Sequence, residues 1–215
     1  MQQTQRAPLL TQPPLNKMYI EIGALVNPDL LQSLGDRFYG LAIEHDISDL
    51  ILSAGSDVVR VSSSTFCADT KQTLPGFDLS DELKADLTRA LSAVCRDPEP
   101  VWDQAWLRIK GHGKGTERHS DRYYVESTPS LAQQLAENLH VATVWILLKD
   151  LDPEKYAFQS RLKFDGKTCC KLKRAGDGVV FDIDQVHEAT AGRLMSTVGV
   201  RISFDLRFVH RGFIP

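Results

Sequence analysis

The feature that most constrains the fold is a change of hydrophobic period after Pro100. Before it, apolar residues recur every three or four positions, whereas after it they alternate with polar residues in short segments separated by glycine-bearing turns. No long helical pattern separates these segments, so they predict antiparallel strands of a sandwich or barrel. The predicted strands are 103–110, 123–126, 141–149, 158–164, 178–184 and 198–209.

The part of the chain before Pro100 is expected to supply two amphipathic helices. The first runs from Pro28 to about Glu44, with Asn27 placed to cap it, and the second begins after the N-cap Ser80. One short helix, 130–138, is expected among the strands. Residues 1–17 contain three prolines and no periodic pattern and are expected to form a flexible arm, while residues 18–215 are expected to form a single domain.

Composition limits the classes of partner. The 215 residues are 42% hydrophobic, which is enough for one core without metal or disulfide support. A net charge of −3 offers no overall attraction for nucleic acid or an anionic membrane. The longest apolar run, 141–148, is too short to cross a bilayer, and the N-terminus lacks a secretory pattern. A cytoplasmic protein with a small-molecule partner and no nucleic acid is expected; the sequence does not indicate an oligomeric state.

Three residues in the predicted β region have the composition of a metal site. His119 and Asp121 are two positions apart, so on an extended chain both side chains leave the same face, and His187 follows the strand pattern GVVFDI 66 residues later. Two imidazoles and one carboxylate on one side of an octahedron suit ferrous iron and leave positions for a cosubstrate and oxygen. Zinc accepts the same donor groups, so the donor set alone does not choose the metal.

The last predicted strand carries an unusual polar face. Its apolar residues alternate with Arg201, Ser203, Asp205 and Arg207. Such a face is either a solvated edge with an Arg/Asp ladder or a surface that holds an anion. Arg201 lies fourteen residues after His187 and shares its face with Ser203. A guanidinium fork beside a hydroxyl is suited to binding a carboxylate.

Taken together, the motifs HSD at 119–121, GDGVVFDIDQVH at 176–187 and RISFDLRF at 201–208 resemble the iron(II)/2-oxoglutarate-dependent oxygenases. The stretch HVATVWILLKDLDPE is similar to the phytanoyl-CoA dioxygenase-like branch, and the fourteen-residue step to the arginine is also similar to the clavaminate synthase group. The resemblance covers about residues 102–209.

The resemblance implies a mainly β fold with flanking helices, the double-stranded β-helix or jelly roll with eight strands that cupins share. It implies that His119, Asp121 and His187 bind Fe(II) and form the catalytic centre. It also implies that Arg201, with Ser203 as second donor, binds 2-oxoglutarate. The activity implied is hydroxylation of a small organic molecule with O2, coupled to oxidative decarboxylation of 2-oxoglutarate to succinate and CO2.

Four further residues are candidates for the site. Arg108 shares a strand face with Gln104, Trp106 and Lys110, and it is either a cavity residue that meets the cosubstrate or a surface charge. Trp145 is either a packing residue or a wall beside the cosubstrate. Tyr123 is expected at the rim, where it would contact substrate. Arg207 either captures a substrate carboxylate or forms an ion pair with Asp205 or another neighbour.

Two other functions remain open at this stage. One is a cupin-like isomerase or hydrolase that uses zinc or manganese at the same three residues without 2-oxoglutarate. The other is a jelly-roll binding module whose metal site is accidental or structural.

Overall fold

The computed structural model describes residues 19–22, 26–54, 58–63, 77–111, 115–137, 139–150, 162–168, 172, 174–189 and 200–214. The arm expected over residues 1–17 lies outside them. Within the described residues no helix is long and apolar enough to cross a membrane.

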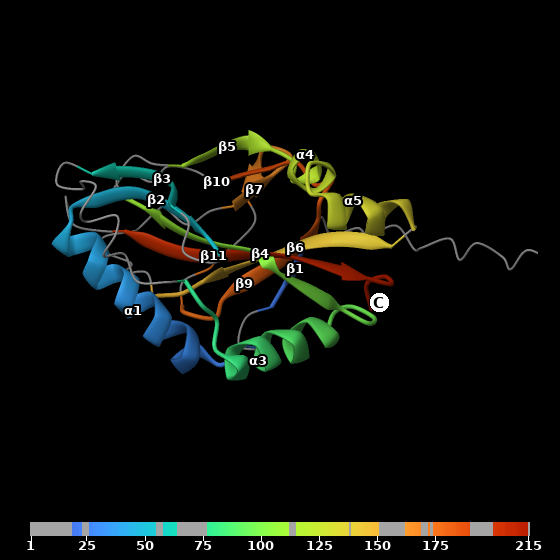
Figure 1. Ribbon diagram of the computed structural model, residues 1–215, viewed down its shortest axis with the longest axis horizontal. Helices are drawn as coiled ribbons and strands as arrows, with labels where there is room; N and C mark the ends of the chain where they lie inside the picture. Colours follow the sequence, from blue (N-terminus) through green and yellow to red (C-terminus); the bar gives the residue numbers. More distant parts are fainter. Residues whose placement is uncertain are drawn as a thin grey trace, which may run out of the picture.

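A seven-stranded sheet forms the centre of the molecule (Figure 1). In spatial order its strands are β1 (Ile20–Glu21), β9 (Gly178–Asp182), β6 (His140–Leu147), β11 (Arg201–His210), β4 (Glu99–Lys110), β2 (Ile47–Ser53) and β3 (Val58–Ser63). The pairings between these strands are antiparallel, as the alternating pattern predicts. β11 is not a solvated edge, because it pairs with β4 and β6 and all of its residues are buried.

A smaller four-stranded sheet faces one side of the large one. Its strands, in spatial order, are β5 (Thr116–His119), β10 (His187–Ala189), β7 (Leu162–Phe164) and β8 (Lys167–Thr168). Apolar side chains from the two sheets meet in a core between them, including Trp145 and Phe181 from the large sheet and Leu162 and Phe164 from the small one. Two facing antiparallel sheets confirm the mainly β architecture, with more strands than the eight that the resemblance implied.

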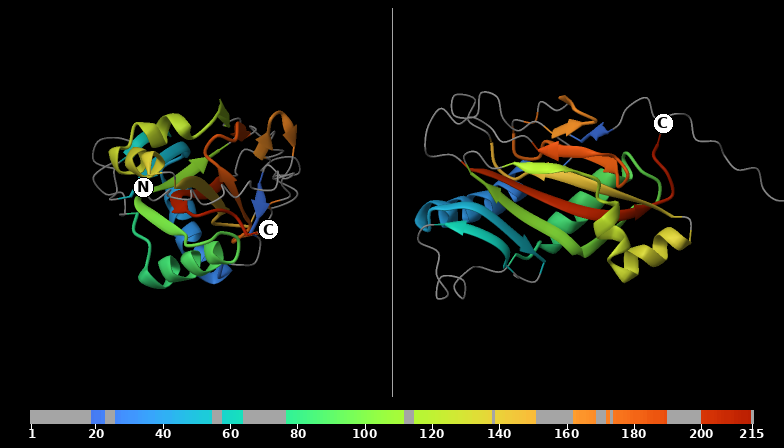
Figure 2. Two further views of the ribbon diagram at one scale, coloured as in Figure 1. Left: turned by 90° about the vertical axis from the view of Figure 1, so that its right-hand side faces the viewer. Right: turned by 90° about the horizontal axis from the view of Figure 1, so that it is seen from above.

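Two helices cover the opposite side of the large sheet, α1 (Pro28–Glu44) and α3 (Asp81–Ser92) (Figure 2). Both were predicted, and so were their caps: the side chain of Asn27 accepts a hydrogen bond from the backbone N–H of Asp29, and Ser80 Oγ accepts one from Leu83. Their apolar faces join the largest hydrophobic cluster of the molecule with residues of β4, β6 and β11. The helices therefore stabilise the large sheet from the side opposite the small sheet.

One predicted strand is wrong. Residues 123–126 lie in a short helix, α4 (Arg122–Glu126), which is followed by α5 (Pro129–Ala136), the short helix expected at 130–138. Tyr, Tyr and Val favour strands, but tertiary contacts override that preference. The backbone N–H groups of Asp121 and Arg122 both donate to the carbonyl of Ile183, which turns the chain into the helix.

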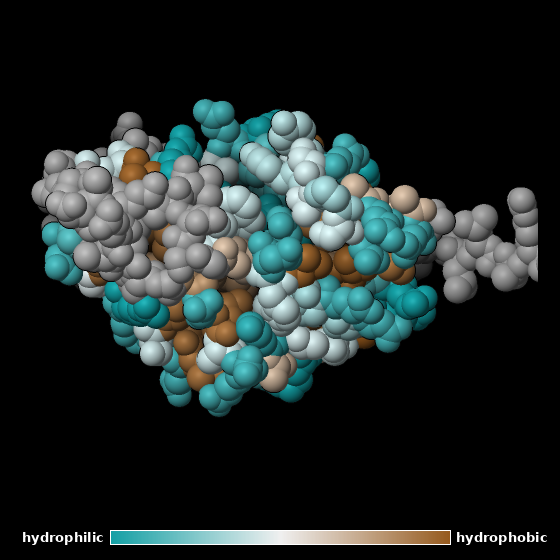
Figure 3. Space-filling model, viewed as in Figure 1, coloured by the Kyte–Doolittle hydropathy of each residue, from teal (hydrophilic) through white to brown (hydrophobic). Residues whose placement is uncertain are grey.

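Helices α4 and α5 close one end of the space between the sheets. Their apolar residues Val125 and Leu131 pack in a small cluster with Val141, Ile183 and Val209. In the space-filling view, hydrophobic side chains show in a band beside α5 and between α1 and α3, and hydrophilic ones surround them (Figure 3).

Candidate metal centre

The pairing of β5 with β10 brings two of the predicted metal ligands together. His119 and His187 are direct cross-strand partners, and their ring centroids are 4.4 Å apart. Asp121 follows β5 where the chain turns into α4, and its Oδ1 lies 3.4 Å from His119 Nε2 and 3.9 Å from His187 Nε2. One ligand atom from each residue lies within 4.8 Å of the others. The three side chains can therefore share one ion.

Backbone carbonyls orient both imidazole rings. His119 Nδ1 is 2.6 Å from the carbonyl oxygen of Glu117, and His187 Nδ1 is 2.9 Å from that of Gln185. Because a carbonyl oxygen can only accept, each Nδ1 carries the proton and donates it. In the neutral ring this leaves the lone pair on Nε2, the atom that faces Asp121, free to bind a metal.

Asp121 is held in its charged form. Burial by itself would raise the pKa of this carboxyl, but the Arg207 guanidinium and hydrogen bonds from His119 and Thr143 hold the pKa far below its usual range. Thr143 Oγ1 donates to Asp121 Oδ2 at 2.5 Å, and Arg207 Nη2 lies 3.1 Å from Oδ1. A deprotonated carboxylate with fixed orientation is what a metal ligand requires.

The two histidines differ in their tendency to accept a proton. The hydrogen bond with Asp121 raises the pKa of His119, whereas burial lowers the pKa of His187. Asp121 thus carries the negative charge of the cluster, and the imidazole of His187 remains neutral, with an electron pair available for a metal.

The donor set fits a divalent transition metal. Two imidazoles and one carboxylate form a facial triad suited to ferrous iron, and zinc also accepts these groups. The three residues face a small cavity of about 30 Å³, which exceeds the ~10–15 Å³ that one water needs. Trp145, Thr143 and Phe181 also line it.

The polar face of β11 is buried beside this cavity. Arg108 forms a bidentate ion pair with Asp205: its Nε donates to Asp205 Oδ1 at 2.6 Å and its Nη2 donates to Asp205 Oδ2 at 3.1 Å. Arg207 Nη1 also donates to Asp205 Oδ2, at 2.6 Å. Arg207 therefore bridges Asp205 and Asp121. Of the two roles that the sequence left open for Arg207, the structure shows the ion pair with Asp205 or another neighbour. The four charges make a continuous network next to the metal ligands.

Two more residues of that face were predicted to bind a carboxylate. Arg201 is 5% exposed, and its guanidinium carbon lies 5.5 Å from the centre of the Trp145 ring. Ser203 is fully buried, and its Oγ has no hydrogen-bond partner among the described residues. Neither residue lines the small cavity, but Trp145 does, so Arg201 lies behind one of the walls of the cavity.

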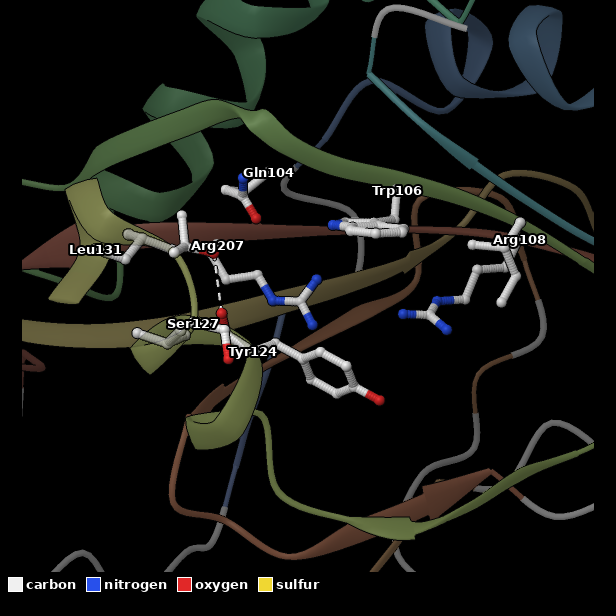
Figure 4. A pocket seen from close by; sticks show the side chains of 10 residues that line it. Gln104, Trp106, Arg108, Tyr124, Ser127, Leu131 and Arg207 are labelled. Atoms are coloured by element: carbon white, nitrogen blue, oxygen red, sulfur yellow. Dashed lines mark hydrogen bonds between the residues drawn. The ribbon is translucent and has the colours of Figure 1, made fainter. Parts of the chain in front are cut away.

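A larger cavity of about 310 Å³ adjoins the centre (Figure 4). Arg108 and Arg207 line both cavities and so lie between them. Tyr124 lines the larger cavity, whereas Tyr123, the neighbour predicted to contact substrate, lines neither and is 73% exposed. The sequence pattern placed Gln104 and Trp106 on the face of Arg108 but assigned them no role; both line the larger cavity.

Comparisons with known proteins extend these observations. No family model matches the sequence, and no curated protein matches it. Solved structures do match. A prolyl hydroxylase from Trichoplax adhaerens, in complex with a peptide of the hypoxia inducible factor oxygen degradation domain, has 12% identity and a TM-score of 0.53, over 91% of this chain and 86% of its own.

Two further structures agree. The viral collagen prolyl hydroxylase of Paramecium Bursaria Chlorella virus-1, in complex with 2-oxoglutarate, has 11% identity and a TM-score of 0.51 over 92% of this chain and 98% of its own. The non-haem α-ketoglutarate-dependent carbocyclase SnoK from nogalamycin biosynthesis has 14% identity and a TM-score of 0.50 over 91% and 81%. The chain therefore has the double-stranded β-helix fold of the iron(II)/2-oxoglutarate-dependent oxygenases.

Proposed function

We propose that the protein is a non-haem Fe(II)/2-oxoglutarate-dependent oxygenase that hydroxylates a small organic molecule. The observation that carries this proposal is the convergence of His119, Asp121 and His187 at the end of the two facing sheets. Because 66 residues separate Asp121 from His187 in the sequence, only the fold brings these ligands together. The solved structures support a fold in which such chemistry is common.

In this proposal the two Nε2 atoms and the Asp121 carboxylate hold the iron. The Nδ1 atoms of the two histidines donate to the carbonyls of Glu117 and Gln185, which directs each Nε2 toward the metal position, and the hydrogen bond from Thr143 orients the Asp121 carboxylate. When bound, iron, 2-oxoglutarate and O2 supply the oxidation: the cosubstrate becomes succinate and CO2, and one oxygen atom enters a C–H bond of the substrate.

Arg201 and Ser203 are proposed to receive the distal carboxylate of 2-oxoglutarate. Both lie on the face of β11 that is directed at the small sheet, and the buried hydroxyl of Ser203 has no hydrogen-bond partner within the described part of the chain. A buried polar group without a partner costs roughly 1–3 kcal/mol, which a bound carboxylate would recover. Trp145 and Arg108 line the small cavity and would flank the cosubstrate.

The test is turnover of 2-oxoglutarate labelled at C1, in the presence of ferrous iron and ascorbate. The full chain is expected to release labelled CO2 even without substrate, and Asp121→Ala is expected to abolish the release. Glu188→Gln is the matched control, because Glu188 follows His187 on β10 but pairs with Lys163 instead of facing the cluster.

A second measurement separates the other two functions. Anaerobic addition of 2-oxoglutarate to the ferrous protein is expected to produce a visible charge-transfer band that Arg201→Met weakens. Bound metal without that band or CO2 release would contradict the proposal in favour of a cupin-like isomerase or hydrolase. A protein that binds no divalent metal would contradict it in favour of a binding module.

A further inference from the structure

The larger cavity has a defined position relative to the metal centre. It lies between β4 and the α4–α5 segment, and it shares Arg108 and Arg207 with the cavity of the metal ligands. Its volume of about 310 Å³ falls at the small end of the ~300–1,000 Å³ that is typical of small-molecule sites. A ligand in this cavity would have one end against the two guanidinium groups, beside the candidate metal ligands.

The walls of the cavity suit a flat apolar body. Trp106 on β4 and Tyr124 on α4 contribute rings from opposite sides, and the guanidinium groups point into the space between them (Figure 4). Ile51, Val125 and Leu131 also line it. Aromatic side chains bind another ring by stacking or edge-to-face contact as well as by burial.

The charges in the cavity select against cations. No Asp or Glu is among the described residues that line it, and its charged groups are those of Arg108 and Arg207. The hydroxyls of Ser127 and Thr128 already donate to carbonyl oxygens of α4. A protonated amine would therefore find no carboxylate of the described residues facing the cavity, because the carboxylates of Asp205 and Asp121 are already paired with the two arginines.

Arg108 retains the capacity to bind an anion. A guanidinium has five N–H groups, and two of those on Arg108 donate to Asp205, so three remain for another acceptor. Its bond to Asp205 also fixes the fork, which reduces the entropy lost on binding a carboxylate.

Gln104 adds a polar group at the far end. It is four residues from Arg108 on the same face of β4, a separation of about 13 Å along an extended strand. Its amide both donates and accepts hydrogen bonds. A ring with a carboxylate side chain at one end and a hydroxyl at the other has polar groups at both ends of such a span.

We propose that the substrate is an aromatic carboxylic acid. The ring lies against Trp106 and Tyr124, the carboxylate binds Arg108, and a polar ring substituent meets Gln104. This inference rests on the proposed function in so far as the bound acid is a substrate. In this orientation the carbon atoms adjacent to the carboxylate are the part of the ligand that lies nearest to the candidate metal ligands.

The test is direct binding to the full chain, measured by calorimetry without metal or 2-oxoglutarate. The probes are 3-(4-hydroxyphenyl)propionate, its primary amide, the corresponding propylamine and the ring-saturated acid. The aromatic acid is expected to bind at least about tenfold more tightly than the amide and the saturated acid, and more tightly still than the amine. Arg108→Gln is expected to remove the preference for acid over amide.

Matched variants distinguish contact from general damage. Trp106→Leu is expected to weaken binding of the aromatic acid about tenfold, whereas Trp102→Leu, on the same strand but packed against the helix-side core near Lys84, is expected to leave it unchanged. Tyr124→Leu tests the opposite wall at an exposed position where folding is not at risk.

The inference is overturned if the amine or amide binds as tightly as the acid, if no acid binds at millimolar concentration, or if Trp106→Leu and Tyr124→Leu bind like the unchanged chain. These results are independent of CO2 release from 2-oxoglutarate. Turnover without acid binding would remove this inference alone, whereas acid binding without turnover would contradict the proposed function and leave a binding site for an aromatic acid.

Discussion

The two faces of the seven-stranded sheet are formed by side chains of the same strands, but different interactions stabilise the packing on each face. On β11, Phe204 and its apolar neighbours pack against α1 and α3, while Asp205 and Arg207 on the other face form an ion-pair network with Arg108 and Asp121. Burial of apolar area is non-directional and tolerates exchange of side chains. A buried ion pair offers little net stability but fixes geometry, and loss of one partner is costly. The helix side thus maintains the fold, and the other side positions the site.

The sharpest way to separate the two faces is Phe204→Ala. This side chain is fully buried and makes an edge contact with Phe77 at 6.3 Å. The substitution is expected to lower the free energy of unfolding by about 3–5 kcal/mol in urea titrations, with little change in the metal affinity of the folded protein. Equal losses in both quantities would show that the faces are not separable.

The next effect is a dependence of stability on pH that arises from His210. This side chain is 1% exposed, packs against Phe208, Phe213 and His140, and burial lowers its pKa to about 4. Because the pKa of 6.5 in the unfolded chain is higher, the unfolded chain binds a proton first as the pH falls.

The contribution of His210 to stability is therefore fully present above pH 6.5 and decreases by about 1.4 kcal/mol per pH unit down to pH 4, roughly 3 kcal/mol in all. Urea titrations at several pH values measure this decrease. His210→Asn keeps an acceptor for the N–H of Gly212 but does not titrate, so its curve should be flatter than that of the unchanged chain by this amount. Parallel curves would contradict the assignment.

On the polar face, Arg207→Met is expected to weaken metal binding by about 10–100-fold, the range found when a group that orients a ligand is removed. The reason is that Asp121 Oδ1 loses its ion pair. Metal titration at pH 7 measures the change. Arg211→Met, which removes an exposed arginine that pairs with Asp97, should leave the affinity unaltered; a similar decrease in both variants would point to net charge instead of orientation.

The smallest effect lies on the helix side. Ser80→Ala removes the cap of α3 and is expected to lower stability by about 1 kcal/mol, while Ser92→Ala at the other end, which loses only a bond to the carbonyl of Thr88, should change it by less than about 0.5 kcal/mol. Neither should affect metal binding. A change in metal affinity with Ser80→Ala would couple the two faces.

The local sequence pattern was sufficient to predict structural features that depend on neighbouring residues in the chain. The alternation on 201–208, the helix with its cap at Asn27 and the shared face of Gln104, Trp106 and Arg108 follow from period and cap chemistry. The HxD spacing indicated two of the three candidate metal ligands, whereas the approach of His187 depends on the pairing of β5 with β10. The helix at 122–126 did not follow, because it depends on the distant carbonyl of Ile183.

The ion-pair network of Arg108, Asp205, Arg207 and Asp121 could not be predicted from local sequence pattern either, because it also depends on residues that are distant in the sequence. Arg108 and Asp205 are 97 residues apart in sequence, and their pairing depends on β4 and β11 being neighbours in the sheet. Tyr124 lines the larger cavity and Tyr123 does not, since adjacent side chains of the helix α4 point about 100° apart; which of the two faces the cavity depends on how α4 packs against the sheet.

The central place of β11 has a consequence for biosynthesis. Its two partners, β4 and β6, precede it in the chain, so both leave the ribosome with an unpaired edge and with Asp121 lacking its arginine partner. Unpaired edges are templates for association with other chains. Until β11 has paired with both strands, the open edges of β4 and β6 are thus the places where the newly made chain is most prone to aggregate.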